Sequence, residues 1–170
     1  MRWQKEKEKV VNSLEIEGIG KVKEIDMAYR CIYFGIKELV SPIVYDKWKE
    51  QAWMFFDENV LQDLDTIRET YGKGIIINNW ATGGNLKQCG LRSNMDELVK
   101  SKKTLYLSAH CLAKGFDLHC KYGHNQKLWQ HVYNLILNKK LKKFRRLENL
   151  KATPTWTHAD CFQSDSIVFC

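Results

Sequence analysis

The segment Ser108–His119 limits what this chain can fold into more than any other stretch of the sequence. It holds His110 and Asp117, with the small residues Ala113 and Gly115 between them. If a loop here runs into a strand, His110 and the odd-numbered positions after it are expected on one side of the backbone. Small side chains leave room on that side, so the imidazole and the carboxylate can converge on one ion.

An imidazole and a carboxylate that converge are typical of a zinc site. Both groups bind zinc well, and a catalytic zinc has three protein ligands with its fourth position left to water. The third ligand must therefore come from another part of the chain. We interpret His158, in the segment Pro154–Asp160, as the best candidate for that ligand.

Length and composition indicate one globular domain. The chain has 170 residues, and 44% of them are apolar, which is enough for a buried core. No apolar run approaches the roughly 20 residues that cross a bilayer, so we expect no membrane span. Residues 1–9 lack the apolar core of a secretory signal. This predicts synthesis and retention in the cytoplasm, unless another protein releases the chain.

The cysteine pattern adds no second metal site. The six cysteines include no Cys-x-x-Cys pair, so they indicate neither a structural zinc cluster nor a small disulfide scaffold. We expect reduced, mostly packed thiols, because the sequence shows no secretory signal.

The charge balance favours anionic partners. The formal net charge is +7, and much of it lies in the run Lys139–Arg146. Nucleic acid, an anionic membrane or an acidic cell-wall polymer would each suit such a run. We interpret the run instead as a solvated helix end, because cations there complement the helix dipole. No nucleic-acid motif accompanies the run, so we expect no specific nucleic-acid binding.

The hydrophobic pattern predicts an α+β domain at 31–170, with a small central antiparallel sheet flanked by helices. Residues 1–30 are charge-rich and weakly patterned, and we interpret them as an N-terminal extension without an assigned role. Helical spacing of apolar residues predicts helices at 36–40, 44–56, 60–71 and 125–138. Alternation and β-branched runs predict strands at 74–80, 144–150, 156–162 and 166–170.

Several of these motifs together resemble a known family. Ser108-Ala-His110, Asp117 and Trp156-Thr-His158 are similar to motifs of the zinc D-Ala-D-Ala carboxypeptidase and L-alanyl-D-glutamate endopeptidase superfamily. Its members cut the peptides of bacterial cell walls and include phage endolysins. The stretches 72–80 and 89–92 resemble the family's strand and its Ser-Gly-Tyr-Arg-type turn. The resemblance covers about residues 35–170, and it implies the Hedgehog/D-Ala-D-Ala peptidase-like fold.

The resemblance implies a role for each matching residue. His110, Asp117 and His158 would be the ligands of a zinc ion (Zn2+). Arg92 would bind or polarise the scissile peptide. Ser108 would support the ligand loop from behind.

His119, two residues after Asp117, could share its face of the strand and lie near the metal. The small pair between His110 and Asp117 is swapped relative to the family, which places Ala113 before Gly115. We expect the swap to be tolerated, because both residues are small.

One position departs from the family pattern. The family usually has a general-base carboxylate three residues before its last histidine, where this chain has Thr155. The nearest acids are Asp160 and Glu148. On a strand, Asp160 would share a face with His158 at roughly 6–7 Å, to hold the attacking water or to orient a ligand. We expect Asp160 in the catalytic role, with Glu148 on a neighbouring strand as the alternative.

The function that the resemblance implies is a monomeric zinc metallopeptidase that hydrolyses peptide bonds of peptidoglycan. The missing signal would suit a phage lysis enzyme that reaches the wall with the help of a holin. Carboxypeptidase and endopeptidase activity remain equally open, because the depth of the pocket decides between them. The alternatives are a zinc-holding wall-binding or phage structural module without turnover, and a basic nucleic-acid-binding protein.

Overall fold

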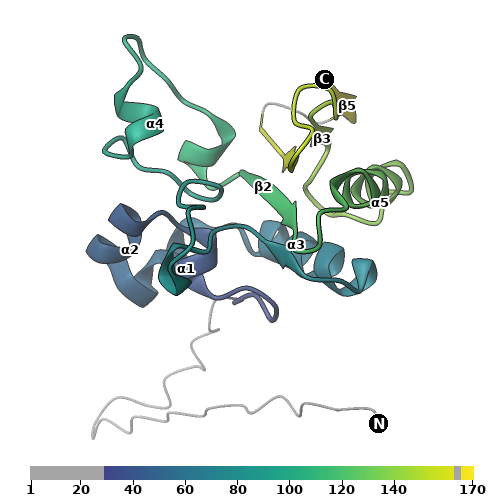
Figure 1. Cartoon of the computed structure of the whole chain (residues 1–170), viewed down its shortest axis with the longest axis horizontal. Helices are drawn as coiled ribbons and strands as arrows, with labels where there is room; N and C mark the ends of the chain where they lie inside the picture. Colours follow the sequence, from purple (N-terminus) through teal and green to yellow (C-terminus); the bar gives the residue numbers. More distant parts are fainter. Residues whose placement is uncertain (1–28, 163–165) are drawn as a thin grey trace, which may run out of the picture.

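The computed structural model describes residues 29–162 and 166–170 (Figure 1). The N-terminal extension expected at 1–30 therefore lies almost wholly outside the described residues. Helices and a five-stranded sheet in one chain confirm the α+β class. The elements are, in order, α1 (Ile36–Leu39), α2 (Pro42–Trp48), η1 (Lys49–Phe55), α3 (Glu58–Tyr71), β1 (Ile75–Ile76), η2 (Trp80–Thr82), α4 (Glu97–Lys100), η3 (Ala109–Leu112), β2 (Gly115–Cys120), α5 (Asn125–Leu137), β3 (Arg146–Leu147), β4 (Thr157–Asp160) and β5 (Val168–Phe169).

The sheet has the strand order β1-β2-β4-β3-β5. Its first four strands pair antiparallel, as predicted, but β5 pairs parallel with β3 through Arg146 and Val168. The prediction of a wholly antiparallel sheet is therefore wrong at this edge. The reason is topological: β5 reverses direction after β4, but β2 and β3 already occupy both edges of β4. The strand pairs instead with the free edge of β3, to which it is parallel.

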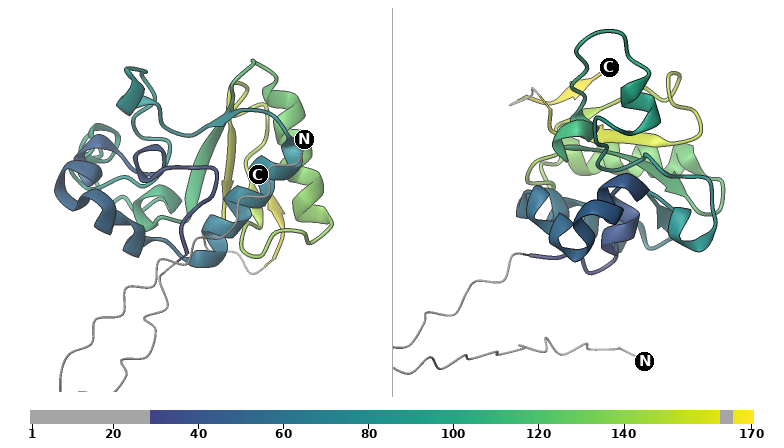
Figure 2. Two further views of the ribbon diagram at one scale, coloured as in Figure 1. Left: turned by 90° about the horizontal axis from the view of Figure 1, so that it is seen from below. Right: turned by 90° about the vertical axis from the view of Figure 1, so that its left-hand side faces the viewer.

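The two long helices begin and end close to where the sequence predicts. The Asp57 carboxylate accepts the N–H of Asn59 at the start of α3, and Gly72 ends the helix at a φ of 68°. The helix α5 buries Leu128 and Val132 on one face. Both helices lie on one side of the sheet and contact each other there (Figure 2).

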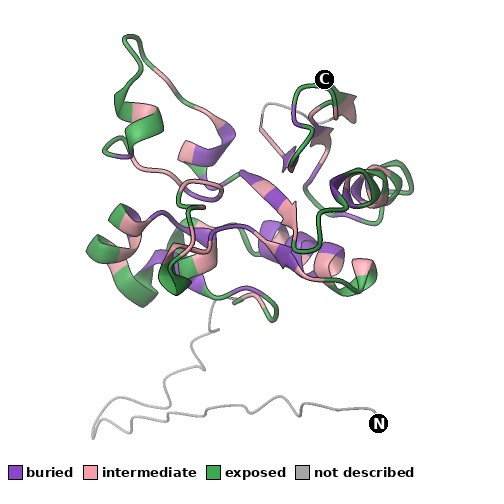
Figure 3. Cartoon of the chain, in the orientation of Figure 1, coloured by how far each residue is buried: buried purple, intermediate pink, exposed green. Residues whose placement is uncertain are grey.

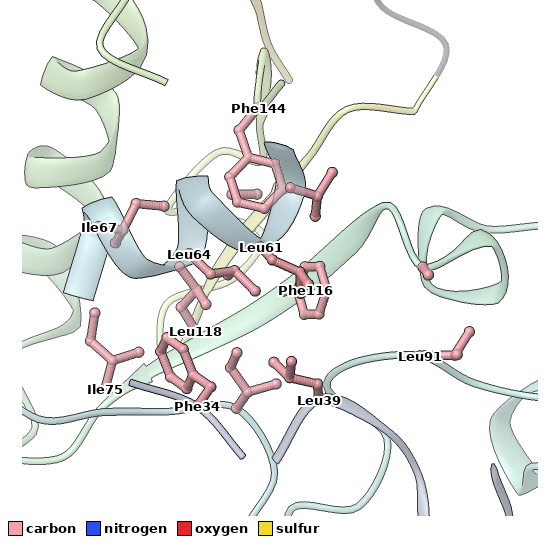
Figure 4. Close-up of a cluster of buried hydrophobic side chains, with 14 of the residues drawn as sticks. Phe34, Leu39, Leu61, Leu64, Ile67, Ile75, Leu91, Phe116, Leu118 and Phe144 are labelled. Atoms are coloured by element: carbon pink, nitrogen blue, oxygen red, sulfur yellow. The ribbon is translucent and has the colours of Figure 1, made fainter. Parts of the chain in front are cut away.

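The core fixes which face of each strand points inward. Phe116 and Leu118 of β2 are buried against Leu61 and Leu64 of α3 (Figure 4). In the middle of β2 burial alternates, because Phe116 and Leu118 are buried while Asp117 and His119 are partly exposed, and Figure 3 shows both classes along this strand. Because side chains alternate along a strand, Asp117 points to the opposite face of the sheet, away from the core. A register slip by one residue would exchange the two faces, so the core also fixes the direction of Asp117.

The strand predicted at 74–80 is shorter than expected. Only Ile75–Ile76 pairs with another strand. Beyond it, the buried Asn78 side chain donates to the carbonyl of Val40 and accepts the N–H of Cys89. These bonds connect the segment to two loops instead of to a strand, which ends the sheet at β1.

All six cysteines are free thiols, and five of them are partly buried. None of the described helices combines the length and the apolar character needed to cross a membrane.

Candidate metal centre

His110, Asp117 and His158 meet at one point on the face of the sheet opposite α3 and α5. Their donor atoms all lie within 4.8 Å of one another. His110 Nε2 is 3.3 Å from His158 Nδ1, and Asp117 Oδ1 is 3.4 Å and 2.7 Å from these two nitrogens. Two ligands at ordinary zinc distances in a tetrahedron are about 3.3 Å apart. Two of the three separations match that value, and the third, between Asp117 and His158, is a hydrogen-bond distance. The three side chains that the sequence predicts as ligands therefore form a group that could hold one metal ion.

Strand register and a tight turn bring the three residues together. Asp117 and His158 are direct partners in the antiparallel ladder between β2 and β4, so both side chains point to the same face. His110 arrives differently from the expected alternation, because residues 109–112 form a 3-10 turn. Ala113 ends that turn at a φ of 55°, a left-handed conformation that costs a non-glycine residue about 1 kcal/mol.

Glycine at 115 gives the histidine room. Gly115 is the ladder partner of Asp160, beside the ring of His158. A Cβ at this position would lie 3.3 Å from His158 Cε1 and 2.6 Å from the Cβ of Ala109. The sequence predicts small residues between the ligands. At position 115 the packing requires one, because a side chain would collide with Ala109.

The second nitrogen of each imidazole is already held by the protein. His110 Nδ1 lies 2.9 Å from the carbonyl oxygen of Gly90. His158 Nε2 lies 2.8 Å from Oδ2 of Asp160. A ligand histidine generally uses its other nitrogen in this way, which fixes the ring and its tautomer. Nε2 of His110 and Nδ1 of His158 are thereby directed at the same point.

Arg92 holds the carboxylate ligand from the other side. Its Nη2 donates to Asp117 Oδ2 at 3.1 Å, and its Nε donates to the carbonyl of Gln88. The Arg92 side chain is only 10% exposed. It therefore leaves Asp117 Oδ1 facing the two histidines. The part predicted for Arg92 in substrate binding remains a prediction, and the residue does line the cleft above the site.

The Asp160 carboxylate is placed to orient the His158 imidazole. Its side chain is fully buried and accepts hydrogen bonds from His158, Arg146 and the N–H of Phe162. The carboxylate lies on the side of the imidazole away from the converging donors. Of the two roles considered for Asp160, holding a ligand is the one that this geometry favours.

Glu148, the alternative candidate for the general base, directly follows the neighbouring strand β3 and lines the cleft. Its backbone N–H donates to the carbonyl of His158, so the two residues lie side by side across the sheet. A cleft of about 390 Å³ covers the metal-binding group. It is lined by Arg92, Tyr106, Ser108, Ala109, His110, Asp117, Arg146, Glu148, Trp156, His158, Phe162 and Cys170.

Ser108 and His119 lie near the centre without belonging to its donor group. Ser108 lines the cleft, and its Oγ lies 3.5 Å from the Cys111 thiol. His119 Nε2 lies 3.5 Å from the thiol of Cys89. Burial lowers the pKa of His119 and raises the pKa of Cys89 to about 12. Both groups are therefore neutral near neutral pH, which argues against a Cys–His nucleophile here.

Sequence reasoning missed Arg146, which lines the cleft and holds Asp160. The sequence indicates only that Arg146 is one more cation of a basic run, which is expected to be solvated. The predicted strand at 144–150 places residues 146 and 148 on one face. If Glu148 faces the site, as the alternative expectation requires, Arg146 must face the same side.

The charges of the centre are strongly coupled. Burial alone would lower the pKa of His158, but the adjacent Asp117 and Asp160 carboxylates outweigh it and raise the pKa to about 9. Burial alone would likewise raise the pKa of Asp117, and the two histidines lower it instead. Near neutral pH the metal-free site therefore contains an imidazolium between two carboxylates.

Comparisons of this chain with protein-family models, with curated proteins and with solved structures find no match. The converging donors of His110, Asp117 and His158 are therefore the main indication of function.

Metal binding should release a proton. His158 is protonated below about pH 9, and a metal needs the lone pair of its Nδ1. Apparent zinc affinity should therefore rise with pH up to about 9. Calorimetry near neutral pH, in buffers of different ionisation enthalpy, should give about one proton released from this group. Zinc binding without proton release would contradict this assignment of charge.

Gly115→Ala should disturb both the fold and the metal site. The added methyl has no space beside Ala109, so we expect a loss of about 1–3 kcal/mol in the free energy of unfolding, together with weaker zinc binding. Gly35→Ala is the matched control, because a Cβ there meets only Glu38 Oε2 at 3.8 Å. Urea unfolding and zinc competition measure the two effects. Equal behaviour of the two variants would show that position 115 tolerates a side chain.

Proposed function

We propose that this protein is a zinc-dependent peptidase that hydrolyses peptide bonds of bacterial peptidoglycan. One observation carries the proposal: three largely buried donors of the right types converge, and both histidines have their remaining nitrogens held by the protein. Three protein ligands beneath a cleft leave a fourth position for water, which is the arrangement of catalytic zinc sites.

Each residue of the site has a part in this scheme. A bound zinc ion would lower the pKa of water and polarise the substrate carbonyl. Glu148 takes the proton from the attacking water and returns it to the leaving amine, because it is the cleft carboxylate that is not a ligand. Asp160 and Arg92 hold His158 and Asp117 in place. Arg92 also stabilises the negative charge that develops on the carbonyl oxygen.

The choice of peptidoglycan rests on the family resemblance of the ligand motifs. The same resemblance supports a phage lysis enzyme that acts on the wall after release through a holin. A wall-binding or phage structural module without turnover would use the same zinc ligands. The presence of Glu148 in the cleft favours the peptidase over that module.

The basic run offers little support for a nucleic-acid-binding protein. Lys142 contacts Gln62, and Lys143 pairs with Asp57 at 3.2 Å. The Arg145 guanidinium donates to three backbone carbonyls, and Arg146 pairs with Asp160. Four of the six cations in 139–146 therefore have partners within the protein, so the run is largely part of the fold.

The test is hydrolysis of purified sacculi by the zinc-loaded protein. We expect new amino groups from the wild type and none from His110→Ala, which removes a ligand. Glu148→Gln should keep its zinc and lose at least about 100-fold in rate, as for the loss of a general base. Asp160→Asn should weaken zinc binding by about 10-fold to 100-fold and recover most of its rate at saturating zinc.

These variants also separate the alternatives. Full activity of His110→Ala would overturn the scheme. Zinc-dependent wall binding without hydrolysis would identify the binding module instead. A loss of rate in Asp160→Asn that zinc does not restore, with Glu148→Gln active, would return the general-base role to Asp160.

A further inference from the structure

Two rows of side chains cross the sheet beneath the cleft. Strand pairing aligns Asp117 with His158, and Glu148, which directly follows β3, donates its backbone N–H to the carbonyl of His158. The same pairing aligns Asp160 with Arg146 in the next row. Residues two apart on a strand are about 7 Å apart, so the second row lies about that far from the metal ligands.

Arg146 is bound firmly on one side and open on the other. Its Nε and Nη2 donate to the Asp160 carboxylate at 2.8–3.0 Å, and that carboxylate is fully buried. Within the described part of the chain, the hydrogen bonds and ion pairs of the Arg146 guanidinium involve Nε and Nη2, and Nη1 has no hydrogen-bond partner. The Arg146 side chain is 30% exposed and lines the cleft. A pre-positioned guanidinium with free N–H groups is suited to binding a carboxylate.

The charges around the cleft favour an anionic ligand. Among the charged side chains that line it, Asp117 and Glu148 balance Arg92 and Arg146. Asp160 lies behind Arg146 and adds one further negative charge. A divalent cation on the three ligands therefore leaves the group with a net positive charge. Arg92 donates to Asp117 and is nearly buried, which leaves Arg146 as the more accessible of the two cations.

The geometry points to Arg146 as an anchor for a carboxylate of the substrate, one or two residues away from the bond that is cut. One extended residue spans about 3.3–3.6 Å, so a step of about 7 Å matches that separation. The position of the anchor relative to a bond that is cut rests on the proposed peptidase function. The binding of a carboxylate to Arg146 does not depend on that function. The carboxylate is either the C-terminus of the peptide or an acidic side chain, since both present the same group to a guanidinium.

The experiment compares matched peptides that differ by one carboxylate. The first pair is acetyl-D-alanyl-D-alanine and its C-terminal amide. The second pair is a tripeptide amide with a glutamate side chain and its glutamine counterpart. Binding is measured by calorimetry on the metal-free protein and on zinc-loaded Glu148→Gln, which should not turn over. We expect at least one carboxylate to improve binding by about 10-fold, the size of a charge-assisted hydrogen bond.

Arg146→Gln should reduce that preference to less than about 2-fold, and Arg146→Lys should keep part of it. Lys140→Gln is the charge-matched control and should change nothing, because Lys140 does not line the cleft. Arg146→Gln also loses the hydrogen bonds to Asp160, which would weaken zinc binding. Zinc affinity is therefore measured separately. That loss would affect the acid and the amide equally, so the ratio of the two affinities reports on the anchor alone.

The outcomes keep this inference separate from the proposed function. Preference for the acid in one pair identifies the source of the carboxylate. Hydrolysis without any preference in either pair, or a preference that persists in Arg146→Gln, overturns the anchor and leaves the peptidase standing. A preference that depends on Arg146 without any hydrolysis supports the anchor and contradicts the peptidase.

Discussion

The His158 imidazole lies between two carboxylates, and the functional face of the sheet is organised around this contact. Asp117 is 2.7 Å from Nδ1, and Asp160 is 2.8 Å from Nε2. Arg92 and Arg146 extend the series outward, so charges alternate in sign through five largely buried side chains. Each buried charge therefore has an opposite neighbour. Removal of an interior member would leave its neighbours without that compensation, which is costly in a protein interior.

The same series explains how one arrangement can exist with and without a metal. In the metal-free protein the positive charge beside Asp117 is the proton on His158, whose pKa is raised to about 9. A divalent cation on the same donors would replace that proton with another positive charge. The alternation of signs is preserved in both states. Each carboxylate therefore keeps a positive neighbour when the metal binds, and the movement required is a separation of Asp117 Oδ1 from His158 Nδ1, from 2.7 Å to about 3.3 Å.

The sequence allowed the ligands to be predicted because their chemistry is local. His110 and Asp117 are close in the chain, and His158 stands in a recognisable motif. The helices α3 and α5 were predicted equally well, since apolar spacing and end residues are also local signals. The parallel pairing of β5 and the bond between Arg146 and Asp160 depend on which strands become neighbours. That choice is made by packing between distant segments, which no single stretch of sequence encodes.

The register between β2 and β4 determines both the core packing and the positions of two metal-binding residues. Phe116 pairs with Ala159 on the buried face, and the adjacent pair, Asp117 with His158, then has to point toward the cleft. The ligands on β2 and β4 are therefore fixed by the core and cannot move independently of it. Glu148 directly follows β3, which lies next to the edge strand β5. Glu148 and Arg146 flank the buried Leu147 and line the cleft beside the donors on β2 and β4.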